Sequence, residues 1–429
     1  MRNEKRSWLP WLVLTGAIIV RGFATGLNTI SSLFLAPVSE TLEIGIGTLS
    51  IYYSIISVVQ ILWFGYAGRL LNQCDVRWVA VKAICLQAIA FAALGFMRNV
   101  AGWYVLAIPL AMGAGILVNL LGPILVNRWF HKNTGTILGI QAACVGLFGA
   151  VLQPMTSNMI EIKGWRETYF SMGLLSLCVM LLAATFFIRN RPVNTLTDKN
   201  SLSGEKHTDQ KQKSKEIRAN KLSEQALQEN AKKTTGSVAL YALILFLFAV
   251  TGVAVFVQHI PTYGTLLGYS MTRIGMVLSL ASIGNAIGSF FIGFLSDRIG
   301  GLRTCYLIIS IWLTAIVGFL FSGTHFMIFM AAAFLNGLVT PSVMVMAPIL
   351  TMSFFGKSDY EKIYAKVSTG VPLASIFLIP IYGFIYDVTG NYLIVLFILC
   401  ILLLLAGFSI AYGWKHQQRR DENETKLQL

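Results

Sequence analysis

The sequence predicts an all-α polytopic membrane protein with twelve transmembrane helices in two six-helix bundles. Of its 429 residues, 55% are hydrophobic and 12% are charged, whereas about a quarter of the residues of a soluble protein are charged. Apolar stretches long enough to cross a bilayer as a helix, which takes about 20 residues, recur twelve times, and a polar segment divides them six and six.

These stretches must be helical, because lipid offers no hydrogen-bond partner to a free backbone amide. The first half contains apolar segments at 9–35, 46–68, 78–97, 101–127, 134–159 and 168–188. The second half contains them at 237–262, 273–296, 303–322, 326–352, 362–386 and 391–413. The first segment is too long for a signal peptide, lacks a small-residue cleavage site and is followed by further spans.

Lys and Arg are distributed unevenly between the two sets of loops. The side that carries both termini has 28 of the 33 basic residues, and the opposite side has only Arg98, Lys163, Arg166 and Arg273. Because positively charged short loops stay in the cytoplasm, we predict a plasma-membrane protein with both termini cytoplasmic. The net charge of +14 therefore reflects a basic inner face of the protein. A basic chain could bind nucleic acid, but a mean hydropathy of +0.68 argues against such a partner.

The polar segment divides the chain into predicted domains. We expect an N-terminal bundle at 1–188, a cytoplasmic linker at 189–235, a C-terminal bundle at 236–415 and a cytoplasmic tail at 416–429. The linker has eleven basic and six acidic residues. It is either a solvated tether or an amphipathic segment on the anionic inner leaflet. Signalling by this linker to a cytoplasmic partner, as in a receptor, is a third hypothesis.

The two halves resemble duplicated units. A shift of 225 residues places Pro123 on Pro348, Trp129 on Phe354, Lys132 on Lys357, Gly68 on Gly293 and Asn72 on Asp297. Repeats of this kind form a substrate site at their interface, near the bilayer midplane, and work by rocking against each other.

The loop after segment 273–296 carries a recognisable motif. It contains a glycine, an Asp-Arg pair, a second glycine and a basic residue, in the order Gly293, Asp297, Arg298, Gly300 and Arg303. This resembles the cytoplasmic signature of the major facilitator superfamily. The resemblance implies that the glycine permits close helix contact and that the charges lock the inner gate. The first-half copy keeps Gly68 and Arg77 but has Asn72 and Gln73 in place of the charged pair.

Further short patterns resemble the monocarboxylate-porter and oxalate:formate-antiporter branches of this superfamily. They comprise Arg128-Trp129-Phe130 with its following glycines, the stretch from His259 to Tyr263, Phe355-Gly356 before Tyr360 and Tyr364, and the stretch from Gly383 to Gly390. The resemblance implies transport of small organic anions, with protons or by exchange. The chain departs from these branches at two places: Ser289 and Val371 stand where the relatives carry Arg and Lys.

Arg21 is the one charged residue inside a predicted span, thirteen residues into segment 9–35. An ionisable residue at the bilayer centre costs about 2.5–3.5 kcal/mol and normally marks a transport path. Thr25 and Asn28 follow on the same helix face, and a guanidinium with donors beside it suits a carboxylate. The alternative is a structural Arg that bonds carbonyls of a neighbouring helix or extends to the interface.

Four further polar residues lie inside predicted spans. Asn285, with Ser289 on the same face, occupies the middle of 273–296, Asn336 the middle of 326–352, and Asn119 the inner part of 101–127. They are candidates for substrate binding, although polar side chains in spans also join helices to one another.

His259 lies near the outer end of segment 237–262. With an ordinary pKa of about 6.5, its imidazole is a candidate for proton coupling. A solvated histidine at the membrane interface is the alternative.

Other classes of function have little support in the sequence. All 19 acidic residues fall in loops, tails or span ends, whereas exporters of cationic drugs commonly use a buried carboxylate; drug export is thus the alternative function. The six scattered cysteines form neither a metal motif nor a disulfide framework. No nucleotide-binding loop or catalytic constellation occurs, so we expect neither an enzyme nor a cofactor.

Overall fold

Every apolar segment forms a helix in the computed structural model, which describes residues 8–130, 134–189, 238–356 and 360–428. No strand occurs in these four ranges. The predicted all-α class with twelve spans in two bundles is confirmed. The predicted linker and the first residues of the chain lie outside the described ranges.

The first half begins with a long span that is broken near its outer end. Its helices are α1 (Leu9–Ile30), η2 (Ser31–Phe34), α2 (Leu35–Leu42), α3 (Ile46–Gln73), α4 (Val76–Leu94), α5 (Val100–Ala114), η3 (Gly115–Leu120), α6 (Leu121–Trp129) and α7 (Thr134–Phe186). Two helices of this half are capped at their first turn by the side chain that precedes them, α4 by Asp75 and α5 by Asn99. In the second half, Ser270 caps α11 (Met271–Ile299) in the same way.

The predicted boundary between 134–159 and 168–188 lies at Gly164, whose φ of 79° and ψ of 168° are not helical. The helical stretch α7 therefore consists of two helices that meet at a kink at this residue. A glycine adopts this positive φ without the steric cost of a Cβ. Consequently eleven helical stretches in the described ranges are long and apolar enough to cross a membrane, and α7 accounts for two spans.

The second half repeats this plan with more breaks. Its other helices are α9 (Val238–Ala254), η4 (Val255–Gln258), α10 (Ile260–Leu266), α12 (Gly301–Leu320), α13 (Phe326–Val339), α14 (Ser342–Phe355), α15 (Tyr360–Val367), α16 (Gly370–Thr389) and α17 (Leu393–Gln428). Segments 326–352 and 362–386 are each divided into two helices, at Pro341 and at the turn before Gly370.

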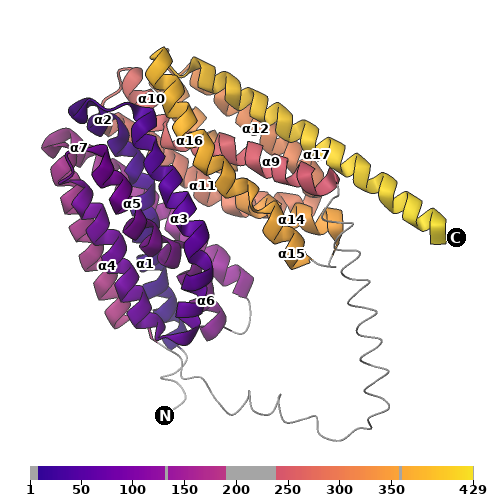
Figure 1. The fold of residues 1–429 in the computed structure, drawn as a ribbon, viewed down its shortest axis with the longest axis horizontal. Helices are drawn as coiled ribbons and strands as arrows, with labels where there is room; N and C mark the ends of the chain where they lie inside the picture. The colour runs from indigo at the N-terminus through magenta and orange to yellow at the C-terminus, as the bar shows by residue number, and fades with distance from the viewer. Residues whose placement is uncertain (1–7, 131–133, 190–237, 357–359, 429) are drawn as a thin grey trace, which may run out of the picture.

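The two bundles meet at one end and diverge toward the other. Figure 1 shows them close together beside α2 and α10 and spread apart at α6 and α15. We call these the outer end and the inner end, after the side that the charge distribution predicts for each. Across the interface, α3 packs on α16 and α7 packs on α11.

Glycines allow the helices to approach closely. A Cβ on Gly383 of α16 would lie 2.7 Å from the Cα of Gly47 on α3, so neither position has room for a side chain in this arrangement. Within the C-terminal bundle, a Cβ on Gly337 of α13 would overlap the carbonyl oxygen of Ala281 on α11. Small residues at such crossings are the usual means of packing membrane helices.

Candidate functional site

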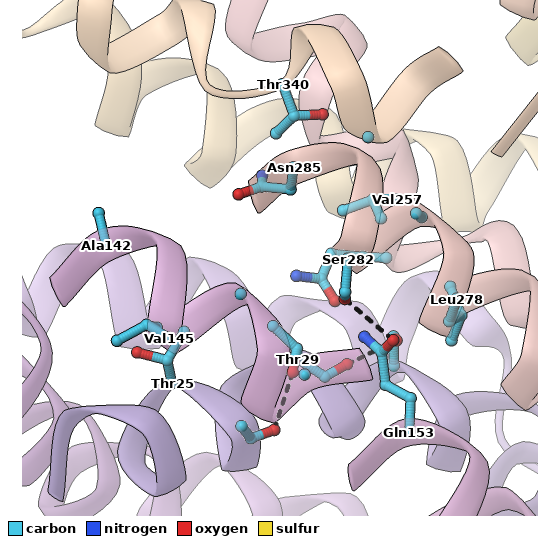
Figure 2. A pocket seen from close by; sticks show the side chains of 17 residues that line it. Thr25, Thr29, Ala142, Val145, Gln153, Val257, Leu278, Ser282, Asn285 and Thr340 are labelled. Carbon is cyan, nitrogen blue, oxygen red and sulfur yellow. Dashed lines mark hydrogen bonds between the residues drawn. The ribbon is translucent and has the colours of Figure 1, made fainter. Parts of the chain in front are cut away.

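Two adjoining cavities lie between the bundles, with volumes of about 240 and 570 Å³. They share seven lining residues: Thr25, Ala142, Val145, Val257, Gln258, Asn285 and Thr340. In Figure 2, Thr25, Ala142 and Val145 lie on one wall, and Asn285 and Thr340 lie on the other. Each bundle therefore supplies one wall of a mainly apolar space that contains several polar groups, at the position expected for a substrate path between repeats.

Arg21 lines the larger cavity from α1. Its Nη1 donates a hydrogen bond of 3.3 Å to Oε1 of Gln141, a fully buried residue of α7. In the described part of the chain, Nε of Arg21 and Nε2 of Gln141 have no hydrogen-bond partner. The cavity wall thus offers the Arg21 cation, which the buried amide of Gln141 holds from behind.

Among the described residues that line the two cavities, Arg21 is the single charged one. No carboxylate among these lining residues neutralises Arg21, and the residue is partly buried. In a medium of reduced dielectric, a guanidinium attracts an anion more strongly than it does in water. This arrangement is chemically suited to hold one carboxylate group.

The predicted polar face of α1 is only partly directed to the cavities. Thr25 lines both of them, and its Oγ1 has no partner in the described ranges. Asn28 instead accepts a 3.4 Å hydrogen bond from Nε2 of Gln87 on α4 and lines neither cavity. Thr29, which the sequence pattern does not single out, lines the smaller cavity in its place.

The C-terminal wall carries neutral polar groups. Asn285 lines both cavities, and Ser289 lines the larger one while its Oγ donates to the backbone carbonyl of Asn285. Gln258 and Thr340 complete this wall and were not predicted. A glutamine inside the apolar segment 237–262 was a signal that could have identified Gln258.

Asn336 and Asn119 lie elsewhere. Asn336 is 2% exposed, and its Oδ1 accepts a 3.1 Å hydrogen bond from Nε1 of Trp312, which joins α13 to α12. Asn119 is exposed within the π-helical turn η3, next to Val118 of the larger cavity wall. Neither asparagine lines the two cavities.

His259 is completely buried inside the C-terminal bundle. Its Nε2 lies 2.9 Å from the carbonyl oxygen of Ile379 on α16, and its Nδ1 lies 3.1 Å from the hydroxyl of Tyr392 beside α17. The carbonyl can only accept, so Nε2 carries the hydrogen and Nδ1 accepts from the tyrosine. Because all three groups belong to one bundle, rocking of the bundles leaves these bonds intact.

Within the described ranges, no hydrogen bond or ion pair joins the predicted inner-gate residues of one bundle to those of the other. A Cβ on Gly68 or on Gly293 would meet no atom within 4 Å. Asp297 is exposed and has no ion pair within the described ranges, and the guanidinium of Arg298 lies 4.9 Å from the ring centre of Phe294.

The remaining gate residues are also apart. Arg77 donates a 2.6 Å hydrogen bond to the carbonyl of Thr185 at the end of α7, and Arg303 is exposed. Asn72 is in helix α3, and its side chain lies outside the described part of the structure. The bundles are thus apart at the inner end (Figure 1). A hydrogen bond of 3.1 Å from Ser282 to Gln153 joins them beside the smaller cavity (Figure 2).

Comparison with known proteins places these features in context. The family model described as Major Facilitator Superfamily matches residues 16–304 and 242–428. The chain is 22% identical over 369 residues to the uncharacterized MFS-type transporter YhjX of Escherichia coli strain K12, covering 85% of this chain and 86% of the relative.

Two groups of functionally named relatives also match. The chain is 21% identical over 309 residues to the oxalate:formate antiporter of Oxalobacter formigenes, covering 70% of this chain and 66% of that protein. It is 29% identical over 177 residues to monocarboxylate transporter 4 of Rattus norvegicus, covering 39% of this chain and 36% of that protein.

Solved structures show the same fold. A bacterial homolog of the human lysosomal transporter Spinster, in an inward-facing and unoccupied conformation, superposes with a TM-score of 0.69 at 12% identity, covering 96% of this chain and 98% of that one. A point mutant of the nucleoside transporter NupG superposes with a TM-score of 0.64 at 12% identity, covering 96% of this chain and 99% of that chain.

Proposed function

This chain belongs to the Major Facilitator Superfamily, and we propose that it is a secondary-active transporter of a small monocarboxylate or related organic anion. It is a multi-pass membrane transporter and not an enzyme. The observation that carries the proposal is Arg21, the single charged side chain that lines the two cavities in the described ranges. A guanidinium supplies N–H donors that a carboxylate accepts, and the hydrogen bond from Nη1 to Gln141 helps to fix the position of the side chain.

The neutral opposite wall limits the charge of the cargo. Gln258, Asn285, Ser289 and Thr340 present amides and hydroxyls but no second cation. A second carboxylate would be buried there without a counter-charge, which is costly. The arrangement therefore favours an anion with one charged end and a neutral end.

Transport would follow from rocking of residues 1–188 against 236–415, with the linker at 189–235 connecting them. The chain would sit in the plasma membrane with both termini cytoplasmic, and the open inner gate would then represent an inward-facing state. Asn28 and Asn336 would stabilise the bundle in which each lies, and Asn119 would act from beside the larger cavity rather than from its wall.

Exchange of one anion for another is the coupling that we favour. Proton coupling through His259 is the alternative, and it requires the ring to release the bonds that hold it inside the C-terminal bundle. The name of one relative, an oxalate:formate antiporter, supports exchange, whereas the monocarboxylate transporters are named for their cargo alone.

Export of amphipathic compounds is a second candidate. It is supported by the apolar part of the larger cavity, where Val145, Val257, Phe290 and Met344 line the wall.

A ligand-stabilisation screen of the purified protein separates the two functions, because a ligand that binds only the folded state raises its apparent stability. Short monocarboxylates should raise the melting temperature, and their amides, which have similar size but no charge, should not. Stabilisation by amphipathic cations without any response to carboxylates would contradict the proposal and support export.

A further inference from the structure

At the outer end, a carboxylate of the C-terminal bundle caps a helix of the N-terminal bundle. The two oxygens of Asp387, near the end of α16, accept hydrogen bonds of 2.7 and 2.8 Å from the backbone N–H groups of Ile46 and Gly47. These N–H groups belong to the first turn of α3, and the N-cap residue of this helix, Gly45, has no side chain that could cap it. A Cβ on Gly45 would lie 2.5 Å from the Asp387 carboxylate, so this glycine permits the approach.

The reverse contact occurs on the other side of the interface. Glu161 of α7, in the N-terminal bundle, accepts hydrogen bonds of 2.8 and 2.6 Å from the backbone N–H and the Oγ1 of Thr272. Thr272 lies in the first turn of α11, in the C-terminal bundle. Each bundle thus provides one carboxylate to the first helical turn of the other.

The two contacts are related by the internal repeat. Gly47 and Thr272 are 225 positions apart, and Glu161 and Asp387 are 226 positions apart. A second pair of contacts obeys the same relation: Ser54 donates to the carbonyl of Ile376, and Ser279 donates to the carbonyl of Ala150, each at 2.6 Å. The duplicated sequence therefore forms the same contact scheme twice across the interface.

We propose that Glu161 and Asp387 form a two-point latch that holds the outer gate closed and that opens at both points together during transport. Carboxylates are stabilised at helix N-termini by the free N–H groups and the helix dipole. Ordinary caps such as Asp75 and Asn99 lie within three residues of their donors and move with them. Glu161 and Asp387 lie in the opposite bundle from their donors, so outward opening must break all four bonds.

Hydrogen exchange without substrate tests the latch directly, through the variants Asp387→Asn and Glu161→Gln. Asp387→Asn should speed exchange about tenfold, the change expected from weakening a charged hydrogen bond, in residues 46–53 and also in residues 271–278, which it does not contact. Glu161→Gln should have the same effect on both segments. The control is Glu43→Gln, which alters an exposed carboxylate at the same end of the molecule and should leave both segments unchanged.

The effect on the distant segment is the decisive result. If each variant accelerates exchange only in the segment it contacts, the carboxylates are independent local caps and the proposal is wrong. Ser54→Ala and Ser279→Ala should show the same coupled effect at smaller amplitude, which keeps the test valid if a carboxylate variant folds poorly. Since no anion is present, the result is independent of the proposed substrate.

Discussion

Replacement of Arg21 by Gln should abolish most of the affinity for the transported anion. The substitution removes the one charge that lines the cavities in the described ranges and leaves an amide of shorter reach. Hydrogen bonds to charged groups contribute about 1.5–3 kcal/mol each. Since about 1.4 kcal/mol corresponds to a tenfold change in Kd, losing one such bond predicts a Kd about 10- to 150-fold higher.

Arg21→Lys should fall between wild type and Arg21→Gln, because lysine keeps the charge but cannot hold a carboxylate with two parallel N–H groups. Isothermal titration with the carboxylate that stabilises the protein most would give the three values of Kd. Arg98→Gln is the matched control, because Arg98 is exposed at the outer end. A Kd that is unchanged in a folded Arg21→Gln protein would refute the assignment of Arg21 to the site.

Three other predictions concern residues around the cavities. Asn336→Ala should lower the free energy of unfolding by about 1 kcal/mol, because Nε1 of Trp312 loses its acceptor, and should leave the Kd of the anion unchanged; a large change in Kd would contradict its structural role. His259→Gln should lower the melting temperature, because it disrupts buried bonds, without altering the response of uptake to an imposed pH gradient; loss of that response would assign the coupled proton to His259. Gly293→Ala should preserve the melting temperature, since a Cβ there meets no atom within 4 Å, but it should slow transport by obstructing closure of the inner gate. Gly288→Ala should instead lower the free energy of unfolding by about 1–3 kcal/mol, because its Cβ overlaps Leu338. Thermal unfolding and uptake measured on the same preparations would test the pair, and equal destabilisation would contradict it.

Most of the fold could be predicted because crossing a bilayer requires long apolar helices, and most of their ends lie within a few residues of those expected. The last helix is an exception, because α17 continues to Gln428, well beyond the predicted end at 413. The motif around Asp297 predicted the superfamily, and the comparison with the family model confirms it. The resemblance to the monocarboxylate and oxalate:formate branches is confirmed as well, at low identity. The break between the two helices of α7 falls at Gly164, inside the predicted interval between 134–159 and 168–188.

The site was partly predictable for a related reason. A charge such as Arg21 is conspicuous in an apolar span, and the helical period correctly associates it with Thr25. Whether a polar residue faces the cavity or a neighbouring helix depends on how each helix is rotated in its bundle, and this separates Asn285 from Asn336. Gln258 lies where the span changes from α- to 3-10 geometry, so a regular helical period does not give its direction.

Exchange in proteoliposomes tests most directly whether the chain carries a small organic anion across the membrane. Vesicles containing the purified protein would be loaded with a labelled monocarboxylate and diluted into buffer with or without the same unlabelled anion. We predict saturable release of label that external anion accelerates and that Arg21→Gln abolishes. If external anion does not change the rate of release, and if wild type and Arg21→Gln release the label equally fast, the proposed function is wrong.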